Sequence, residues 1–488
     1  MVLKSLSRYP KGMRRPSLII ICCLGFMAGL LLGYNFIFQP NSYWLLFVAI
    51  STAASFVISK KLKFVPLLLV CVVCGLAYTT SYINTQAEQS ASRDIYRKIV
   101  AVGTVKGDPY WDKDRNYVFS LADVTINGQA KSSEIRIKTF SSAVKEGHRV
   151  KVEGKIFPIL AKPKYQISYG TVEIINFDQP LMIKIKQAFY GGADRALSPD
   201  AAAFMKGILV GARTSLVQPL QDTLNAVGLS HIVAVSGYNL TIMVVLLARL
   251  LKKRWLWGSL VVSLLLVWCF TLLTGMSASI LRAAIMATVF LLAGYYGKKV
   301  SVLVCIGLTA VATLLANPTL AIEDIGWQLS FLSLTGIVVL SPIIRLILPK
   351  RTKIVSELLA ITLAAQIATI PYLLYLFGGY SVVAVVANVA LMPLIPLLML
   401  VGFVLSIVGI VMPNYAYLLG GPVNKGVEII FGFLGYLKAQ SNFQMAIHPD
   451  ITSLAFWYSC LMILALITYN KNRGSELLPF QKPEQLVR

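Results

Sequence analysis

Apolar runs of about 20 residues recur along this chain, and they constrain its fold more than any other feature. A run of that length crosses the roughly 30 Å hydrocarbon core of a bilayer as an α-helix. Lipid offers backbone groups no hydrogen-bond partner, so spanning segments must be helical. Charged residues make up only 14% of the chain, against roughly 25% in soluble domains. We therefore expect a polytopic α-helical membrane protein.

The runs fall into two groups. The first group contains about three expected spans, near 17–38, 44–59 and 64–80. The second group contains about nine, near 230–250, 255–275, 278–296, 300–316, 327–349, 354–377, 381–411, 415–437 and 452–470. The run 381–411 is too long for one straight span and contains Pro393 and Pro396, which predicts a broken helix.

Basic residues set the expected orientation. The net charge is +24, and many of the lysines and arginines lie in short loops that fall on one side of the membrane if each run crosses once. This pattern predicts a multi-pass protein of the cell membrane with both termini in the cytoplasm. The same excess of positive charge also suits an anionic ligand such as a phosphate backbone.

Between the two groups lies a segment of different composition. Short stretches in which apolar and polar residues alternate occur at 98–105, 116–121, 134–138, 149–153 and 165–169. Such alternation, bounded by Gly, Asp, Asn and Pro, predicts strands. Five strands this close together fit an inserted, extracytoplasmic OB-type β-barrel, a fold that often binds oligonucleotides. The same barrel can also serve as a spacer.

Aromatic and basic side chains are interleaved in the predicted barrel. This mixture suits stacking on single-stranded bases beside a cationic groove, although aromatic residues in strands more often belong to the core. The candidate DNA-binding residues are Trp111, Lys113, Arg115, Tyr117, Arg136, Lys138, Lys164 and Tyr165.

These features divide the chain into five parts. The amphipathic pattern of 181–197 suits a helix lying in the membrane interface, and 201–227 is a weak candidate for a crossing. The expected parts are an N-terminal membrane segment (1–84), the OB-type domain (85–180), an interfacial or re-entrant segment (181–227), a polytopic channel domain (228–472) and a cytoplasmic tail (473–488).

Polar residues inside spans are costly and therefore mark functional candidates. They concentrate in four segments, which we call the first to fourth polar segments: 228–240, 274–286, 317–330 and 387–396. Arg282 could bind phosphate oxygens, extend to the surface, or pair with Glu323 or Asp324. The candidates for a polar path are His231, Ser236, Asn239, Arg282, Gln328 and Asn388.

The sequence gives only weak support for an enzyme. His231 and Ser236 suggest an intramembrane hydrolase, but residues five apart do not share a helix face. Cys71 and Cys74 have CxxC spacing without a second pair or histidines nearby, so we expect no metal and no cofactor. We expect no catalytic residue. A secondary transporter or a transporter of a lipid-linked substrate remains the main alternative to a channel.

Several motifs together resemble the ComEC competence family of DNA-uptake channels over roughly residues 15–470. They are Gly228-Leu-Ser-His231 with Ser236-Gly237, Thr274-Gly-x-Ser-x-Ser-x-x-Arg282-Ala-x-x-Met286, Gln328-Leu-Ser-Phe331, and Ala387-Asn388 with Pro393. The resemblance implies an inner-membrane channel that carries single-stranded DNA into the cytoplasm during natural transformation. It also implies an outer DNA receptor or pilus and a cytoplasmic ATPase as partners.

The chain departs from the family pattern in two ways. Tyr238-Asn239 stands where the family often has Leu-His, which puts any role of a second imidazole there in doubt. Many members also carry a nuclease domain that needs several histidines for two metals, whereas this chain has three histidines in total. We therefore expect a separate nuclease to degrade the second strand.

Overall fold

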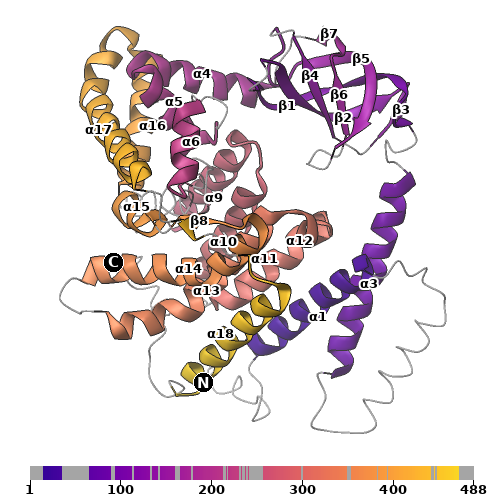
Figure 1. Ribbon diagram of the computed structural model, residues 1–488, viewed down its shortest axis with the longest axis vertical. Coiled ribbons are helices and arrows are strands. Elements are labelled where there is room, and N and C mark those ends of the chain that lie inside the picture. Colours follow the sequence, from indigo (N-terminus) through magenta and orange to yellow (C-terminus); the bar gives the residue numbers. More distant parts are fainter. Residues whose placement is uncertain are drawn as a thin grey trace.

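The computed structural model consists of helices and one β-barrel (Figure 1). It describes residues 15–35, 65–88, 94–112, 115–131, 134–140, 143–159, 165–176, 180–212, 216, 218–229, 232, 237, 240, 256–297, 301–348, 353–381, 383–392, 394–440, 444–445 and 448–471. The expected span 44–59, and nearly all of the span 230–250, lie outside these residues.

Two N-terminal helices, α1 (Arg15–Asn35) and α3 (Val65–Glu88), lie side by side (Figure 1). Gly25, Gly29 and Gly33 of α1 each face α3, and a Cβ built at Gly29 would collide with the carbonyl group of Val72. Small residues four positions apart allow such close contact between membrane helices. The glycines therefore bring the two backbones together, and helices are confirmed where spans were expected near 17–38 and 64–80.

The barrel contains seven strands. They are β1 (Lys98–Trp111), β2 (Tyr117–Ile126), β3 (Gln129–Ala130), β4 (Ile135–Thr139), β5 (Arg149–Pro158), β6 (Tyr165–Ser168) and β7 (Thr171–Asn176). Five of them pair in the order β1-β2-β4-β6-β5, and β5 pairs back with β1, so the sheet closes. All neighbours are antiparallel except β4 and β6, which are parallel. β3 and β7 extend the sheet beside β2 and β5.

The core of the barrel follows from the alternation in its strands. Ile135 and Ile137 are buried, whereas Arg136 and Lys138 between them face outward. Val144, in the loop between β4 and β5, is 1% exposed and packs in the same core, so this loop closes one end of the barrel. The five expected strands are confirmed. β3 and β7 were not predicted, because β3 has two residues and β7 has no fully buried residue.

Outside the barrel, α1 and α3, the described residues form helices and one short strand pair. These elements are α4 (Leu181–Ala196), α5 (Pro199–Val210), α6 (Gln218–Ala226), α9 (Leu256–Leu273), α10 (Ala278–Tyr295), α11 (Val302–Ala316), α12 (Leu320–Glu323), α13 (Ile325–Ile347), α14 (Lys353–Phe377), α15 (Val383–Leu391), α16 (Ile395–Val411), α17 (Pro413–Ala439) and α18 (Ile451–Lys471), with β8 (Tyr380–Ser381) paired to β9 (Gln444–Met445). Among the described residues, three helical stretches are long and apolar enough to cross a membrane: 278–295, 325–347 and 356–377.

The long apolar run 381–411 forms two helices, α15 and α16, as the prolines predict. Pro396 lies in the first turn of α16, where its missing N–H has no partner to lose. Pro393 lies outside the described residues. In the stretch 201–227, α5 and α6 have 12 and 9 residues, so each is shorter than a crossing requires.

Helix α4 connects the barrel to the helical region (Figure 1). Its amphipathic sequence forms a helix, as expected, and Gly192 contacts the carbonyl group of Ser406 in α16. The following helix, α5, is almost entirely buried and contributes Phe204 and Met205 to the largest apolar cluster. Helices α16 and α17 complete that cluster, so α4 and α5 are fixed against them.

Candidate functional site

Two described glycines of the first polar segment, Gly228 and Gly237, lie against α15 and α10. A Cβ built at Gly228 would be 2.6 Å from the Cβ of Ala384 in α15. A Cβ built at Gly237 would be 3.0 Å from the Cβ of Ala283 in α10. Glycine at both positions therefore allows this segment to approach both helices closely. His231, Ser236 and Asn239 lie in this segment but outside the described residues.

These contacts join the first segment to the second and to the helix that carries Asn388 of the fourth. Ala283 directly follows Arg282, and Ala384 lies one helical turn before Asn388. The path candidates Arg282 and Asn388 therefore belong to helices that contact one common segment.

Arg282 is buried, with 3% of the residue exposed. Its Nη2 donates a hydrogen bond to the carbonyl oxygen of Gly326, at 3.1 Å, at the start of α13. The guanidinium carbon also lies 5.6 Å from the centre of the Phe331 ring. Its Nε and Nη1 are buried and have no hydrogen-bond partner within the described residues. A guanidinium has five N–H donors, so most of its hydrogen-bonding capacity is unused among the described residues.

The carboxylates expected near Arg282 have other contacts. Asp324 accepts hydrogen bonds from the backbone N–H groups of Gly326 and Trp327, at 2.9 and 3.2 Å, and so caps α13. Glu323 accepts a hydrogen bond from the Tyr34 hydroxyl of α1, at 3.1 Å. Arg282 of the second polar segment therefore contacts the third segment through Gly326 and Phe331. Its Nε and Nη1 form no hydrogen bond to either carboxylate.

Gln328 was expected in the polar path. In the structure, both polar atoms of its side chain already form hydrogen bonds. Its Nε2 donates to the carbonyl oxygens of Ala321 and Ile322, at 2.8 and 3.1 Å. Its Oε1 accepts a hydrogen bond from the hydroxyl of Tyr372 in α14. These bonds tie α12, α13 and α14 together, so Gln328 supports the site without offering an open group.

Two other amides in the helical region do offer open groups. Asn388 is 6% exposed, and its Oδ1 has no partner within the described residues. Gln366 of α14 is 8% exposed, and both polar atoms of its side chain lack partners there. Gln366 was not predicted, although a single amide among the alanines of an expected span gave the same signal as Asn388.

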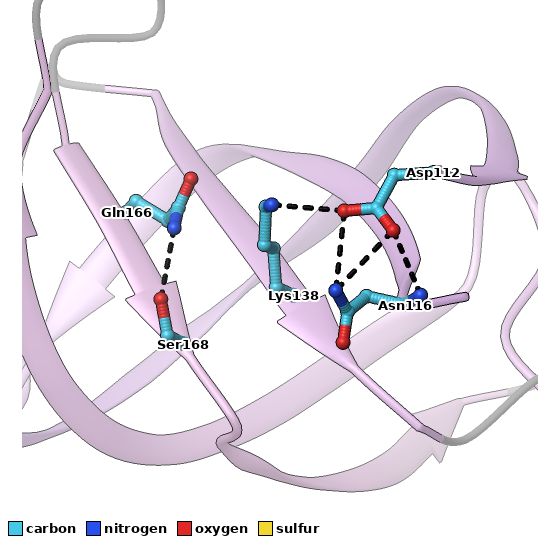
Figure 2. Close-up of polar contacts among 5 residues, drawn as sticks. All are labelled: Asp112, Asn116, Lys138, Gln166 and Ser168. Carbon is cyan, nitrogen blue, oxygen red and sulfur yellow. Dashed lines mark hydrogen bonds and ion pairs between the residues drawn. The ribbon is translucent and has the colours of Figure 1, made fainter. Parts of the chain in front are cut away.

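A second polar cluster lies on the outer face of the barrel. Figure 2 shows Lys138 directed at Asp112, with Nζ 2.8 Å from Oδ2. Asn116 donates from its backbone and side chain to the same carboxylate. Partial burial acts to raise the pKa of Asp112, but the hydrogen bonds from Lys138 and Asn116 outweigh it and lower the pKa to about 2. The charge of Lys138 is therefore held in place by an acidic partner that was not predicted.

The outer face continues across β6. Gln166 lies opposite Arg136 in the parallel ladder, and Ser168 lies opposite Lys138. The Nε2 of Gln166 donates to the Ser168 hydroxyl at 2.8 Å (Figure 2). Strand alternation places these four side chains in one row of basic and polar groups. Alternation could have identified Gln166 and Ser168, but the pairing of β4 with β6 is not readable from the sequence.

Of the remaining barrel candidates, Tyr117 and Tyr165 pack against the apolar core of the barrel. Trp111 is 54% exposed and packs edge to face on Tyr117, with ring centres 5.1 Å apart. Tyr165 is half-buried at the start of β6, and Arg115 is exposed between β1 and β2. The remaining two candidates, Lys113 and Lys164, lie outside the described residues.

A cavity of about 430 Å³ lies where the barrel meets the helical region. Its lining includes Asp108 and Glu146 of the barrel, Lys186 of α4, and Thr274, which begins the second polar segment. Lys186 is 3.1 Å from Asp108 and 2.8 Å from Glu146. Burial raises the pKa of Glu146, and Lys186 acts in the opposite direction. The cavity thus connects the barrel to the turn that precedes α10.

Within the described residues, no group of three or more His, Cys, Asp or Glu side chains is arranged to hold a metal ion. The site offers a guanidinium, amides and a lysine, which bind anions and polar groups through hydrogen bonds. This chemistry suits recognition of a phosphate-containing chain.

Comparison with known proteins gives two matches. Residues 208–471 match the family model described as "Competence protein". The chain is also 23% identical over 322 residues to "ComE operon protein 3" of Bacillus subtilis (strain 168). That match covers 64% of this chain and 40% of the relative. No solved structure matches.

The family match covers more than half of the chain and includes all four polar segments. Its range runs from α5 to the end of α18 and so contains Arg282, Gln366 and Asn388. This chain is a membrane protein that belongs to the competence protein family.

Proposed function

We propose that this protein is an inner-membrane channel that passes single-stranded DNA into the cytoplasm during natural transformation. The observation that supports the proposal is the meeting of the first, second and third polar segments near Arg282, whose Nε and Nη1 are buried without partners among the described residues. A buried cation with open donors needs water or an anion. The phosphates of a passing strand supply such anions.

The barrel belongs to the proposal as an OB-type domain on the outer face. Its five closing strands fit a small Greek-key barrel, in which the second and third strands and the loops around them bind oligonucleotides. The corresponding strands are β2 and β4, which carry the row with Arg136 and Lys138. Lys113 and Arg115 lie in the loop from β1 to β2, and Lys164 lies between β5 and β6.

In this proposal the strand moves from the barrel to the helices in three steps. The barrel face binds bases and phosphates, the cavity beside Lys186 leads to the turn at Thr274, and α10 begins after that turn. Arg282 then binds phosphates through its open donors, while Asn388 and Gln366 provide neutral hydrogen-bonding groups deeper in the bundle. Neutral amides solvate a strand without holding it tightly, which favours movement.

The expected setting is part of the same proposal. The chain crosses the membrane many times, with both termini in the cytoplasm and residues 85–180 outside. A DNA receptor or pilus delivers the strand, a cytoplasmic ATPase assists its movement, and another protein supplies the nuclease. The channel itself performs no catalytic step.

The test is replacement of Arg282 by alanine in cells that take up DNA. We expect Arg282→Ala to reduce internalised labelled DNA at least tenfold while surface-bound DNA stays unchanged. Arg345→Ala is the matched control, because Arg345 also lies in a long apolar helix but pairs with Glu357, 3.7 Å away. Normal internalisation by a correctly folded Arg282→Ala protein would refute the proposed path.

A transporter for a small or lipid-linked substrate is the second candidate. The break between α15 and α16 favours it, because broken helices form substrate sites in many secondary transporters. If deletion of this protein left DNA uptake unchanged, that result would support the transporter over the channel.

A further inference from the structure

Phe140 and Tyr169 form an exposed aromatic pair on the barrel. Their rings are stacked, with centres 5.3 Å apart and an angle of 25° between planes. Phe140 is 68% exposed and Tyr169 is 64% exposed. Most large aromatic residues are buried, because their area dominates the energetics of cores and interfaces. An exposed stacked pair therefore suggests that a ligand covers it.

The pair lies at the ends of two neighbouring strands. Phe140 follows β4 and Tyr169 follows β6, and the N–H of Tyr169 donates to the carbonyl oxygen of Lys138 at 2.8 Å. Alternation along β4 turns Arg136, Lys138 and Phe140 to the same outer face. The aromatic pair therefore lies at the end of the row that contains Arg136, Lys138, Gln166 and Ser168.

The backbone of Tyr169 is arranged to expose its ring. Ile167 points into the barrel and Ser168 points outward, so alternation alone would direct Tyr169 inward. Tyr169 instead has a φ of 58°, a left-handed conformation that is uncommon for residues other than glycine, asparagine and aspartate. This turn of the chain places the ring against Phe140 at the surface. Uncommon backbone conformations of this kind cluster at functional sites.

The surroundings favour a nucleic acid over a membrane surface. The chain carries separate aromatic residues beside its apolar helices, where Trp257 packs on Tyr295 and Tyr295 packs on Tyr296. Such residues at helix ends are typical of membrane interfaces. The Phe140–Tyr169 pair, in contrast, adjoins Lys138 and Ser168, and its stacked rings leave flat outer faces.

We propose that Phe140 and Tyr169 form a platform on which one unpaired nucleobase stacks while the adjoining phosphates follow Lys138 and Arg136. This inference rests on the proposed function and assigns the base-contacting residues of the barrel. Stacking tolerates every base, since each has a π-face. The platform therefore holds a strand without selecting its sequence, as uptake of unrelated DNA requires.

The test measures binding of two labelled oligonucleotides to the purified full-length protein in detergent. One is an oligothymidylate, and the other is an abasic strand of equal length with the same phosphates. We expect the Phe140→Ala, Tyr169→Ala double variant to bind oligothymidylate about tenfold more weakly, because one stacked base contributes on the order of 1–3 kcal/mol. Binding of the abasic strand stays unchanged.

Two control variants make the result specific. Tyr96→Ala removes another exposed ring of the barrel, which is 62% exposed and packs edge to face on Phe157 rather than on Phe140 or Tyr169. It should bind both strands normally. The exchange of Phe140→Tyr with Tyr169→Phe keeps both rings and should also bind normally.

The outcomes separate this inference from the proposed function. If the wild-type protein binds neither strand, the DNA-binding proposal fails and the platform fails with it. If the wild type binds oligothymidylate and the double alanine variant binds it equally well, only the platform is wrong. An equal loss of abasic binding would also overturn the platform.

Discussion

Arg282, Gln366 and Asn388 are polar side chains that lie inside apolar helices with atoms left unpaired among the described residues. An unpaired buried polar group costs about 1–3 kcal/mol, and a charged group costs more. Evolution retains such groups where they serve function, because an apolar residue of similar shape would stabilise the fold. The sequence alone identified Arg282 and Asn388 as polar interruptions of apolar runs. It could not show that Gly326, 44 positions away, accepts a hydrogen bond from Arg282.

Replacing glutamine by leucine at two positions, Gln366 and Gln328, tests whether a buried amide without partners serves function rather than stability. Gln366→Leu removes two unpaired atoms, so we expect equal or higher thermal stability together with reduced DNA internalisation. Gln328→Leu removes hydrogen bonds to Ala321, Ile322 and Tyr372, so we expect it to lower stability by about 1–3 kcal/mol. Thermal unfolding in detergent measures both. A large loss of stability in Gln366→Leu would show that its amide has partners after all.

Glycines determine how the helices pack, and proline determines where one of them breaks. Pro393 and Pro396 predicted a break in the run 381–411, because proline disrupts a helix interior. The structure has two helices there, α15 and α16. The strands were readable from alternation. The pairing of β4 with β6 and the contact between α4 and α16 were not, because both join residues distant in sequence.

Adjacent glycines in α4 provide a matched pair. A Cβ at Gly192 would collide with the carbonyl oxygen of Ser406 in α16, whereas a Cβ at Gly191 would meet no atom within 4 Å. Alanine is better than glycine in a helix by about 1 kcal/mol. We therefore expect Gly191→Ala to raise the unfolding temperature slightly and Gly192→Ala to lower it. Equal effects of the two substitutions would contradict the close packing of α4 on α16.

At the scale of the whole molecule, α4 couples the barrel to the helical bundle. Lys186 binds Asp108 and Glu146 of the barrel, and Tyr190 donates a hydrogen bond to Asp108 at 3.1 Å. The opposite contacts of α4 reach α16 through Gly192. The sequence predicted an amphipathic helix here, with Lys186 among its polar residues. It could not reveal that Lys186 is 8% exposed and forms ion pairs with two carboxylates of the barrel region.

Removing the charge of Lys186 tests whether this coupling serves transport. Lys186→Met keeps the length of the side chain but leaves Asp108 and Glu146 without their shared cation, which costs more at a buried site than at an exposed one. Because the barrel face and Arg282 are untouched, we expect normal surface binding of DNA but at least fivefold less internalised DNA. Faster proteolysis between the barrel and α4 should accompany the loss.

Lys151→Met is the control, since Lys151 also contacts two carboxylates, Glu153 at 3.0 Å and Glu173 at 3.8 Å. Its side chain is 37% exposed, so water replaces the lost ion pairs at little cost. Uptake and proteolysis should both remain normal in this variant. If the two variants behaved alike, the barrel would be only a tethered binding domain, and its orientation against the bundle would have no part in moving the strand.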